Sequence, residues 1–391
     1  MRDRVVITGM GVVSALGIGA EANCAALLCG ESGVRTVRYL PTEHREFLVG
    51  EVPMSGEELR QCLGLPVGVY SRTHLLGVLA LKEALEQSKL LQQSGLALIS
   101  GTTVGGMDVT EHYFPEPQPT GRDIHDCGAS TNEIADYFDC FDYTMTSSTA
   151  CSSAMNALIM GKLLIESGER DVVVAGGAEA LSLFHLNGFK SLMILDTQRC
   201  RPFDQTRAGL NLGEGAAYLV LERESSAVKR GAEILGVLSG VGNGCDAFHQ
   251  TASSENGEGA YLAMTQALAE SGLTPSDIDY VNAHGTGTPN NDASESAALR
   301  RVFSGNVPPV SSTKSYTGHT TSASGSIEAA FCFLAMRNGF LPCQTEFQNI
   351  DEQCITPVSG SESPHGELRH VMCNAFGFGG NDSSIILSRY E

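Results

Sequence analysis

The chain has 391 residues, more than one compact hydrophobic core usually serves, so one large domain or two similar domains are expected. Its formal net charge of -20 argues against nucleic acid as a partner, because binding a phosphate backbone requires a basic surface. Apolar residues make up an ordinary 42%, and the 44 glycines indicate many tight turns.

The N-terminal sequence MRDRVVITGMGVVSALG carries charge and then a short apolar run, but that run is β-branched and broken by glycine. It predicts a first strand and turn rather than an export signal. No run of 18 apolar residues occurs, so no membrane span is expected. The 12 cysteines form no CxxC pair and are expected to be reduced thiols, which predicts a soluble cytoplasmic protein.

Short apolar runs that end in glycine alternate with helical periodicity through the first half of the chain. The predicted strands are RVVITGMG (4–11), LALISGTT (96–103), DVVVAGGAE (171–179) and GEGAAYLVLE (213–222). The predicted helices cover 75–88 and 152–167. Three prolines and mixed polarity over 111–130 predict a long loop that serves as a lid or an interface. The alternation indicates an α/β protein.

The second half of the chain repeats these patterns. AEILGVLSGVG (232–242) resembles the opening strand and turn, and 277–288 resembles 96–103. RHVMCNAFGFGG (369–380) resembles 171–177, and HTTSASGSIEAAF (319–331) begins like the helix predicted at 152. We therefore expect two related halves, 1–230 and 231–391. No Pro-rich or low-complexity linker separates them, so they are expected to pack as one body.

One cysteine stands at the start of a predicted helix. The stretch TSSTACSSAMNALIMGKLLIESG (146–168) surrounds Cys151 with small residues. Unpaired N–H groups and the helix dipole at such a position would expose the sulfur and lower its pKa. From this stretch alone, a small buried hydrophobe is the more frequent role of a free cysteine.

Two histidines favour a reactive site over packing. NAHGTGTPNND (282–292) places His284 just past a strand, and SSTKSYTGHTTSASGS (311–326) places His319 at a glycine-rich helix start, five residues after Lys314. A lone histidine is more often structural than catalytic. Two of them in Gly/Thr/Ser-rich loops, together with Cys151, predict a convergent site.

The glycine-rich stretch NAFGFGGND (374–382) follows a predicted strand. It can be a plain turn, or a loop that brings backbone N–H groups to an oxyanion with Phe376 or Phe378 as an apolar wall or gate. A phosphate loop is disfavoured, because no GxxxxGK[ST] pattern occurs. GMGVVSALG after the first strand lacks the order of a dinucleotide fingerprint.

Taken together, STACSSA, NAHGTGTPNND, STKSYTGH and NAFGFGG resemble the four signature segments of the β-ketoacyl-acyl carrier protein synthases, in order. RPFDQTRAGLNLGEGAAYLVLE (201–222) is also similar to the family pattern, and the resemblance covers essentially the whole chain. It is strongest to the elongating, two-histidine type, which also serves type II polyketide systems. The resemblance implies the thiolase fold, five layers α-β-α-β-α built from two duplicated halves, and a homodimer.

The resemblance also assigns residues. Cys151 matches the nucleophile that takes an acyl chain from a carrier protein as a thioester. His284 and His319 match the pair that holds the malonyl thioester carbonyl and promotes loss of carbon dioxide. Lys314 and Glu328 match residues that orient the histidines and set the local field. The resemblance implies neither metal nor organic cofactor, because loss of the malonyl carboxylate drives the reaction.

Further residues follow from the same resemblance. Phe378 matches the gating phenylalanine, and its backbone N–H and that of Cys151 are expected to hold the oxyanion, with Gly377 and Gly379 on either side of Phe378. We expect Met155, Phe189 and Leu210 to line the acyl pocket, which should be long, apolar and near a dimer interface.

Several features depart from the housekeeping fatty-acid enzymes. The region 106–146 looks shorter, and the glycine loop continues ND where TN is usual. Leu210 stands where an aromatic residue is common. The basic cluster expected before the helix at 75 is reduced to Arg60, Arg72 and Lys82. These departures suggest a specialised ketosynthase of aryl-polyene or polyketide type.

Three alternatives stay open at this point. The chain could be a thiolase-like enzyme that acts on coenzyme A thioesters, although the second loop offers His319 where thiolases pair two cysteines with one histidine. It could be an inactive partner of the chain-length-factor type, although such subunits typically lose the nucleophile. A purely structural role leaves the ordered motifs unexplained. The chain could also be the active half of a heterodimer with a chain-length-factor-like subunit. Acyl carrier protein and malonyl and acyl thioesters are the expected partners, without nucleic acid or membrane.

Overall fold

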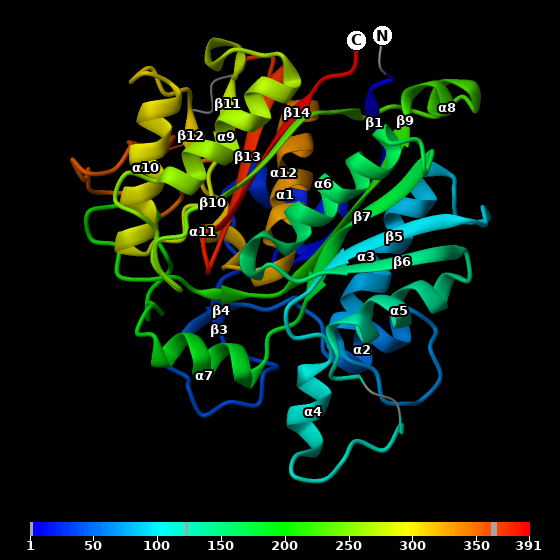
Figure 1. The fold of residues 1–391 in the computed structure, drawn as a ribbon. Helices are drawn as coiled ribbons and strands as arrows, with labels where there is room; N and C mark the ends of the chain where they lie inside the picture. The colour runs from blue at the N-terminus through cyan, green and yellow to red at the C-terminus, as the bar shows by residue number, and fades with distance from the viewer. Residues whose placement is uncertain (1–2, 122–123, 361–365) are drawn as a thin grey trace.

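Strands and helices alternate along the first half of the chain, as the sequence predicts. The computed structural model describes residues 3–121, 124–360 and 366–391 (Figure 1). The elements of this half are β1 (Val5–Ser14), β2 (Gly17–Ile18), α1 (Ala20–Cys29), β3 (Arg35–Thr36), β4 (Leu48–Gly50), α2 (Gly56–Cys62), α3 (Arg72–Ser88), β5 (Leu96–Gly101), α4 (Met107–Tyr113), α5 (Cys127–Phe138), β6 (Phe141–Ser147), a 3₁₀ turn η1 (Ala150–Ser152), α6 (Ser153–Glu166), β7 (Val172–Glu179), α7 (Leu183–Ser191), β8 (Leu212–Gly213), β9 (Gly215–Arg223) and α8 (Glu224–Lys229).

The second half repeats this order with fewer insertions. Its elements are β10 (Gly236–Cys245), α9 (Glu258–Ser271), a 3₁₀ turn η2 (Pro275–Asp277), β11 (Tyr280–Asn282), α10 (Pro289–Val302), β12 (Val310–Ser311), α11 (Lys314–Thr317), a 3₁₀ turn η3 (Thr321–Ala323), α12 (Ser324–Asn338), β13 (His370–Gly377) and β14 (Asn381–Ser388). The predicted strand 277–288 is confirmed over three residues, and its remainder is the loop that carries His284.

The strand order shows that the two halves are duplicates. The first half places the strands of its main sheet in the order β6-β5-β7-β9-β1, and the second half places the corresponding strands in the order β12-β11-β13-β14-β10; β3, β4 and β8 form a separate small sheet. The strand senses also match, with parallel pairs β5/β6 and β5/β7 against β11/β12 and β11/β13, and antiparallel pairs elsewhere in each half. A short antiparallel contact between β1 and β10 joins the two sheets.

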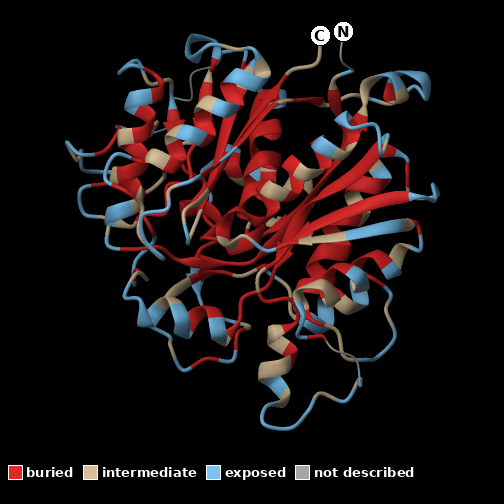
Figure 2. Ribbon diagram, viewed as in Figure 1, coloured by how far each residue is buried: buried red, intermediate tan, exposed pale blue. Residues whose placement is uncertain are grey.

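Helices and sheets stack in five layers. The helices α6 and α12 form the middle layer, where Leu158 and Phe331 share one core with Val173 of β7 and Val371 of β13. The outer layers are α3 and α5 on the first sheet and α9 and α10 on the second. Figure 2 shows the central strands and α12 almost entirely buried, with exposed residues on the edge strand β6 and on the outer helices. The five-layer α-β-α-β-α arrangement is thus confirmed. Across the described part of the chain, no helix has both the length and the hydropathy to cross a bilayer.

Glycines explain why the first strand of each half lies so close to its outer helix. A Cβ on Gly11 of β1 would stand 1.9 Å from the carbonyl oxygen of Ala80 in α3. A Cβ on Gly242 of β10 would stand 2.0 Å from the carbonyl oxygen of Ala263 in α9. Only a residue without a side chain fits such an approach of backbone to backbone. The similarity between the sequences 4–11 and 232–242 therefore has a packing cause.

The predicted long loop over 111–130 is wrong at both ends. The helix α4 continues to Tyr113, and α5 begins at Cys127, so the connection spans 114–126. Residues 122–123 lie outside the described residues. The helix start is set by Asp126, whose side chain accepts a hydrogen bond from the Gly128 N–H. Asp126 could not be recognised from the sequence as a capping residue, because the other acidic residues and the prolines of this stretch indicate irregular structure.

Candidate active site

The turn before α6 presents Cys151 at the start of the helix. Ala150 has φ 53, in the left-handed region that non-glycine residues rarely adopt, and this turns the chain sharply into η1. The Ser153 hydroxyl donates to the Ala150 carbonyl at 2.6 Å and accepts from the Thr149 N–H at 2.9 Å, which holds the turn. The Cys151 side chain is buried there.

Burial decides the protonation state of Cys151 in the free site. It raises the pKa of the thiol to about 11, although the Lys314 charge and the backbone N–H groups of Phe378 and Cys151 lower it. The prediction that the helix start depresses this pKa is wrong, because desolvation outweighs these three effects. The sulfur nevertheless faces two N–H groups, which are the groups expected to hold an oxyanion.

Both predicted histidines converge on Cys151. The His319 Nε2 atom lies 3.0 Å from the Cys151 sulfur, and the His284 and His319 rings meet edge to face with centroids 5.2 Å apart. Burial, and next the Lys314 charge, lower the pKa of each histidine well below 6.5. Both imidazoles are therefore neutral at neutral pH.

Lys314 and Glu328 form a buried ion pair behind His284. The Lys314 Nζ atom lies 2.5 Å from Glu328 Oε1, donates to the His284 carbonyl oxygen at 2.6 Å, and lies 3.4 Å from His284 Nδ1. Burial raises the pKa of Glu328 to about 7, against the opposing effect of Lys314. Because an ammonium group donates, His284 Nδ1 accepts, and its Nε2–H is left to donate toward a ligand.

A cavity of about 330 Å³ opens onto the three reactive side chains. Of the predicted acyl-pocket residues, Phe189 and Leu210 line this cavity, whereas Met155 packs against Gly325 of α12 in the middle layer. The Phe378 ring stacks on the Phe189 ring, with centroids 5.8 Å apart and planes 20° apart. The wall consists of Cys151, Phe189, Leu192, Ile194, Leu210, Thr251, Ala252, Ser253, His284, Thr286, Thr288, Pro289, Asn290, Asn291, His319, Phe376, Gly377, Phe378, Gly379 and Gly380.

One cysteine and two neutral histidines at one site agree with the resemblance to the β-ketoacyl synthases. Comparison with known families tests whether the chain belongs to them. Residues 2–227 match the N-terminal domain of the β-ketoacyl synthases, and residues 235–348 match the C-terminal domain of the same family. The chain belongs to the β-ketoacyl synthase family. This synthase is 33% identical to nodulation protein E of Rhizobium meliloti, over 98% of its own length and 99% of the relative's. It is 32% identical to 3-oxoacyl-[acyl-carrier-protein] synthase 2 of Coxiella burnetii, over 99% of each chain.

Solved structures agree on the fold. The synthase superposes on the ishigamide ketosynthase/chain length factor with a TM-score of 0.91 at 31% identity, covering 100% of both chains. A ketosynthase of Xenorhabdus doucetiae, in complex with its chain length factor, gives a TM-score of 0.83 at 32% identity, with 99% of this chain and 98% of that chain covered. With the duplicated topology, these likenesses confirm the thiolase fold.

Two acidic residues of α10, which the sequence analysis did not single out, hold the His284 loop by its backbone. Glu295 accepts from the N–H groups of His284 at 2.9 Å and Gly285 at 2.8 Å. Asp292 accepts from the N–H groups of Thr286 at 3.0 Å and Gly287 at 3.2 Å. Asp292 and Glu295 follow His284 by eight and eleven positions and lie in the first turns of α10. This spacing could have suggested that they hold the loop.

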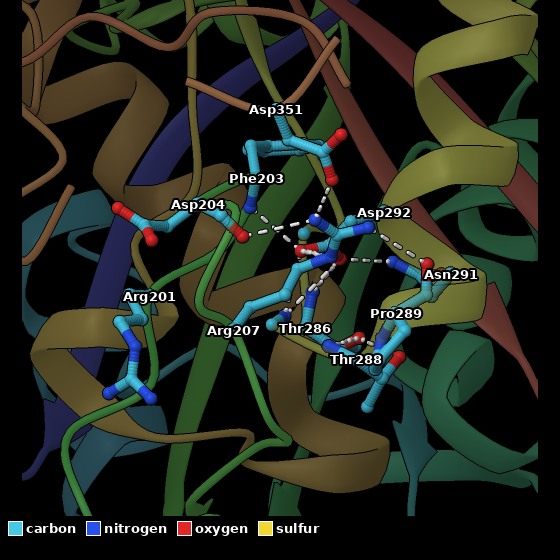
Figure 3. A network of polar contacts seen from close by, with 12 residues as sticks. Arg201, Phe203, Asp204, Arg207, Thr286, Thr288, Pro289, Asn291, Asp292 and Asp351 are labelled. Atoms are coloured by element: carbon cyan, nitrogen blue, oxygen red, sulfur yellow. Dashed lines mark hydrogen bonds and ion pairs between the residues drawn. The ribbon is translucent and has the colours of Figure 1, made fainter. Parts of the chain in front are cut away.

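Figure 3 shows how Asp292 extends this clamp to the segment around Arg207. Asp292 also accepts from the Phe203 N–H at 2.8 Å and lies 3.8 Å from the guanidinium of Arg207. Arg207 in turn pairs with Asp351 at 2.5 Å. Three segments that are distant in sequence are thereby fixed around one wall of the cavity.

The basic residues near α3 are engaged within the protein. The Arg72 guanidinium is largely buried and lies 2.6 Å from Glu214. Arg60 pairs with Glu57 at 2.6 Å and also donates to the Leu65 carbonyl oxygen. Arg72 is therefore not available to a partner protein, because its guanidinium is buried and paired with Glu214.

Proposed function

We propose that this synthase joins an acyl thioester and a malonyl thioester on acyl carrier protein, with loss of carbon dioxide, to give a 3-oxoacyl thioester longer by two carbons. The observation that supports this most directly is the contact of His319 Nε2 with the Cys151 sulfur at 3.0 Å, with the neutral His284 ring beside it. A thiol nucleophile and two neutral imidazole donors at one end of a cavity suit acyl transfer followed by decarboxylation.

The first step transfers the acyl group to Cys151. The sulfur attacks the thioester carbonyl, a C–S bond forms, and the carrier thiol leaves with the proton that Cys151 gives up. The tetrahedral oxyanion is held by the N–H groups of Cys151 and Phe378, which already hydrogen-bond the Cys151 sulfur. The Lys314 charge also favours the thiolate, because Coulomb attraction stabilises the anion.

The second step is decarboxylation at the histidines. When the malonyl carboxylate leaves as carbon dioxide, its electron pair forms an enolate whose oxygen carries the charge. His284 and His319 donate N–H groups to that oxygen, and as neutral imidazoles they do not protonate the carbanion. Lys314 and Glu328 position His284 and keep its Nε2–H available.

In the third step the enolate carbon attacks the acyl thioester on Cys151. A C–C bond forms, the C–S bond to Cys151 breaks, and the sulfur leaves as a thiolate, which takes a proton from solvent to restore the thiol. The acyl chain would lie along the wall that includes Phe189 and Leu210, while the Phe378 loop, with Gly377 and Gly379, separates acyl chain and malonyl donor. Met155, predicted beside the chain, would border this path only if α6 or α12 moved.

Mass spectrometry of the purified synthase with acyl carrier protein substrates tests this function. We expect malonyl and acyl carrier protein to yield carbon dioxide and a carrier-bound 3-oxoacyl chain two carbons longer than the acyl donor. Coenzyme A thioesters should be poor donors. Condensation of two coenzyme A thioesters without a carrier protein, or no carbon–carbon bond formation, would contradict the proposal.

A second candidate is that the chain acts as the active subunit of a heterodimer. The two solved ketosynthases above, at 31% and 32% identity, are described with chain length factors, which favours this candidate for an aryl-polyene or polyketide-type pathway. Condensation that appears only after a chain-length-factor subunit is added would support it. Equal rates for the chain alone would support the homodimer.

We also propose a cytoplasmic location and a boundary between the halves near residue 230. The boundary is supported by the connection between α8 and β10, where the first set of strands ends and the second begins. Expressing 1–230 and 231–391 as separate chains and testing their reassembly would check it.

A further inference from the structure

Three asparagines that are distant in sequence meet beneath the Cys151 turn. Asn156 of α6, Asn243 of β10 and Asn381 of β14 form this asparagine cluster. The Asn381 Oδ1 atom accepts from Asn156 Nδ2 at 2.8 Å and from Asn243 Nδ2 at 3.1 Å. Asn243 also donates to Asn156 Oδ1 at 3.0 Å. In the stretch NAFGFGGND (374–382), the glycines are followed by ND where the family usually has TN, and Asn381 is the first of these two residues.

The asparagine cluster is bonded directly to the nucleophile turn. Ser152, which follows Cys151, shares its hydroxyl hydrogen between Asn381 Oδ1 at 2.9 Å and the Thr149 carbonyl at 2.8 Å. Asn156 Nδ2 donates to Thr149 Oγ1 at 2.8 Å. Ser152, directly after Cys151, therefore contacts Asn381, and Thr149, two positions before Cys151, contacts Asn156 of the same cluster.

Asn381 is also the fixed end of the loop that carries Phe378. It opens β14 opposite Gly377 of β13, and Gly379 and Gly380 between them have φ 82 and 75, values at which glycine turns freely. A Cβ on Gly377 would stand 3.3 Å from the Cys151 nitrogen, so this strand end packs tightly on the turn. Glycine leaves the backbone of this loop freer to rotate than at Asn381, whose side chain is held by three hydrogen bonds.

We propose that Asn381 is a positioning residue that keeps the backbone N–H groups of Cys151 and Phe378 together around the sulfur, by tying the end of the Phe378 loop to Ser152. Loss of its acceptor oxygen frees the Ser152 turn from β14, and the two N–H groups then no longer point at one atom. The role of Asn381 in catalysis rests on the proposed function, whereas the contacts from which it is inferred do not depend on that function.

Alkylation of Cys151 by iodoacetamide across pH 6 to 10, read by mass spectrometry, tests the inference without any thioester. Asn381→Leu has nearly the same shape and no acceptor, so the alkylation profile should shift to higher pH, with about a three- to tenfold slower reaction at pH 8. Ser152→Ala should shift it in the same direction. The double variant should shift it no further than the larger single shift, because both changes break one connection.

Asn338→Leu, which removes the hydrogen bond from the Asn338 side-chain amide to the Leu334 carbonyl oxygen at the far end of α12, is the matched control and should leave the profile in place. A profile of Asn381→Leu that superimposes on the unmodified protein, even with a lower melting temperature, overturns the inference. Additive shifts in the double variant overturn it as well. If Asn381→Leu does not fold, Ser152→Ala alone decides. A shifted profile in a protein that forms no 3-oxoacyl product would refute the proposed function and leave this inference standing.

Discussion

Cys151 lies where a thiolate would be stabilised, yet its free thiol is protonated. Burial raises its pKa to about 11, while Lys314 and the N–H groups of Phe378 and Cys151 act in the opposite direction. Charge that develops on this sulfur or on a bound carbonyl oxygen meets donors that are already oriented, so little reorganisation is needed. The side chain is suited to form and release a thioester rather than to react indiscriminately.

Replacement of Cys151 separates acyl transfer from decarboxylation. Cys151→Ala should take up no acyl chain and form no 3-oxoacyl product, while carbon dioxide release from malonyl carrier protein should persist, because it depends on the histidines. Peptide mapping of the acylated protein and assay of carbon dioxide check this. Cys332→Ala, a change in the core, is the control. A thioester mapped to Cys332 or Cys373 would show that the nucleophile is misassigned.

His319 is expected to act in decarboxylation rather than in thiol activation. His319→Ala should still be acylated at Cys151, because Lys314 and the N–H groups favour the thiolate, but carbon dioxide release should fall by about 10²–10³, as for other oxyanion donors. His44→Ala, away from the cavity, should change neither step. A folded His319→Ala protein that accepts no acyl chain would contradict this division of labour.

The pH dependence of carbon dioxide release reports the neutral histidines. Their pKa values lie well below 6.5, so the neutral, active form is complete at pH 8 and stays complete as pH falls to 6.5. The rate should therefore stay nearly level over this range and fall at lower pH. If both histidines had unperturbed pKa values, the rate of carbon dioxide release would be about fourfold lower at pH 6.5 than at pH 8. The same pH profile should be measured for Glu328→Gln, because the pKa of Glu328 is about 7. A fall in the rate near pH 7 that is absent in this variant would come from Glu328.

The start of α10 is an anchoring element for catalysis. Asp292 and Glu295 accept hydrogen bonds from four consecutive backbone N–H groups, those of residues 284–287. Burial raises the pKa of Glu295 to about 7 and raises that of Asp292 as well, so folding holds two carboxyl groups in an unfavourable environment. The loop geometry around His284 is maintained at that cost.

Asp292→Ala should loosen the His284 loop while leaving the nucleophile in place. Loss of a buried acceptor costs about 1–3 kcal/mol, so the melting temperature should fall by a few degrees. Carbon dioxide release should fall by at least about tenfold, and acylation of Cys151 should be retained. Calorimetry and the two separate assays check this, with Asp136→Ala on the exposed face of α5 as the control. Equal losses in both half-reactions would point to general unfolding instead.

The joined sheet of the molecule ends on one side at β6, whose residues 142–144 are exposed. Tyr143 lies there with 38% of its surface exposed. An exposed edge strand of this kind is a template for pairing with another chain. It is the place in this fold where a second subunit would continue the sheet.

The chain should therefore sediment as a dimer of 41.3 kDa subunits, alone or with a chain-length-factor subunit. Tyr143→Asp should weaken a symmetric dimer, because it brings like charges together across paired edges. Phe248→Asp, the same kind of change at a more exposed aromatic residue (59%) outside β6, should leave the dimer intact. Analytical ultracentrifugation checks both. A monomer for the unmodified chain at micromolar concentration would contradict the expected assembly.

Local patterns were enough to place β1, β5, β7 and β9, the helices α3 and α6, and the reactive loops, whereas β6, β14, α9 and α10 were not predicted. The apolar runs at 4–11 and 171–179 and the periodicity at 75–88 depend on neighbours in sequence, as do the glycine turns around His284 and Phe378. The family resemblance of four short stretches supplied Cys151, His319 and Lys314, and the structure brings them together.

Tertiary structure decided what depends on partners far away in the chain. Met155 sits on a helix that is buried almost all round, so its sequence could not say whether it faces the cavity or α12. The bond between Ser152 and Asn381 spans 229 positions, and an asparagine in isolation has no preferred partner. The thiol pKa was misjudged for the same reason: the helix start is local, whereas desolvation is set by everything that packs around the sulfur.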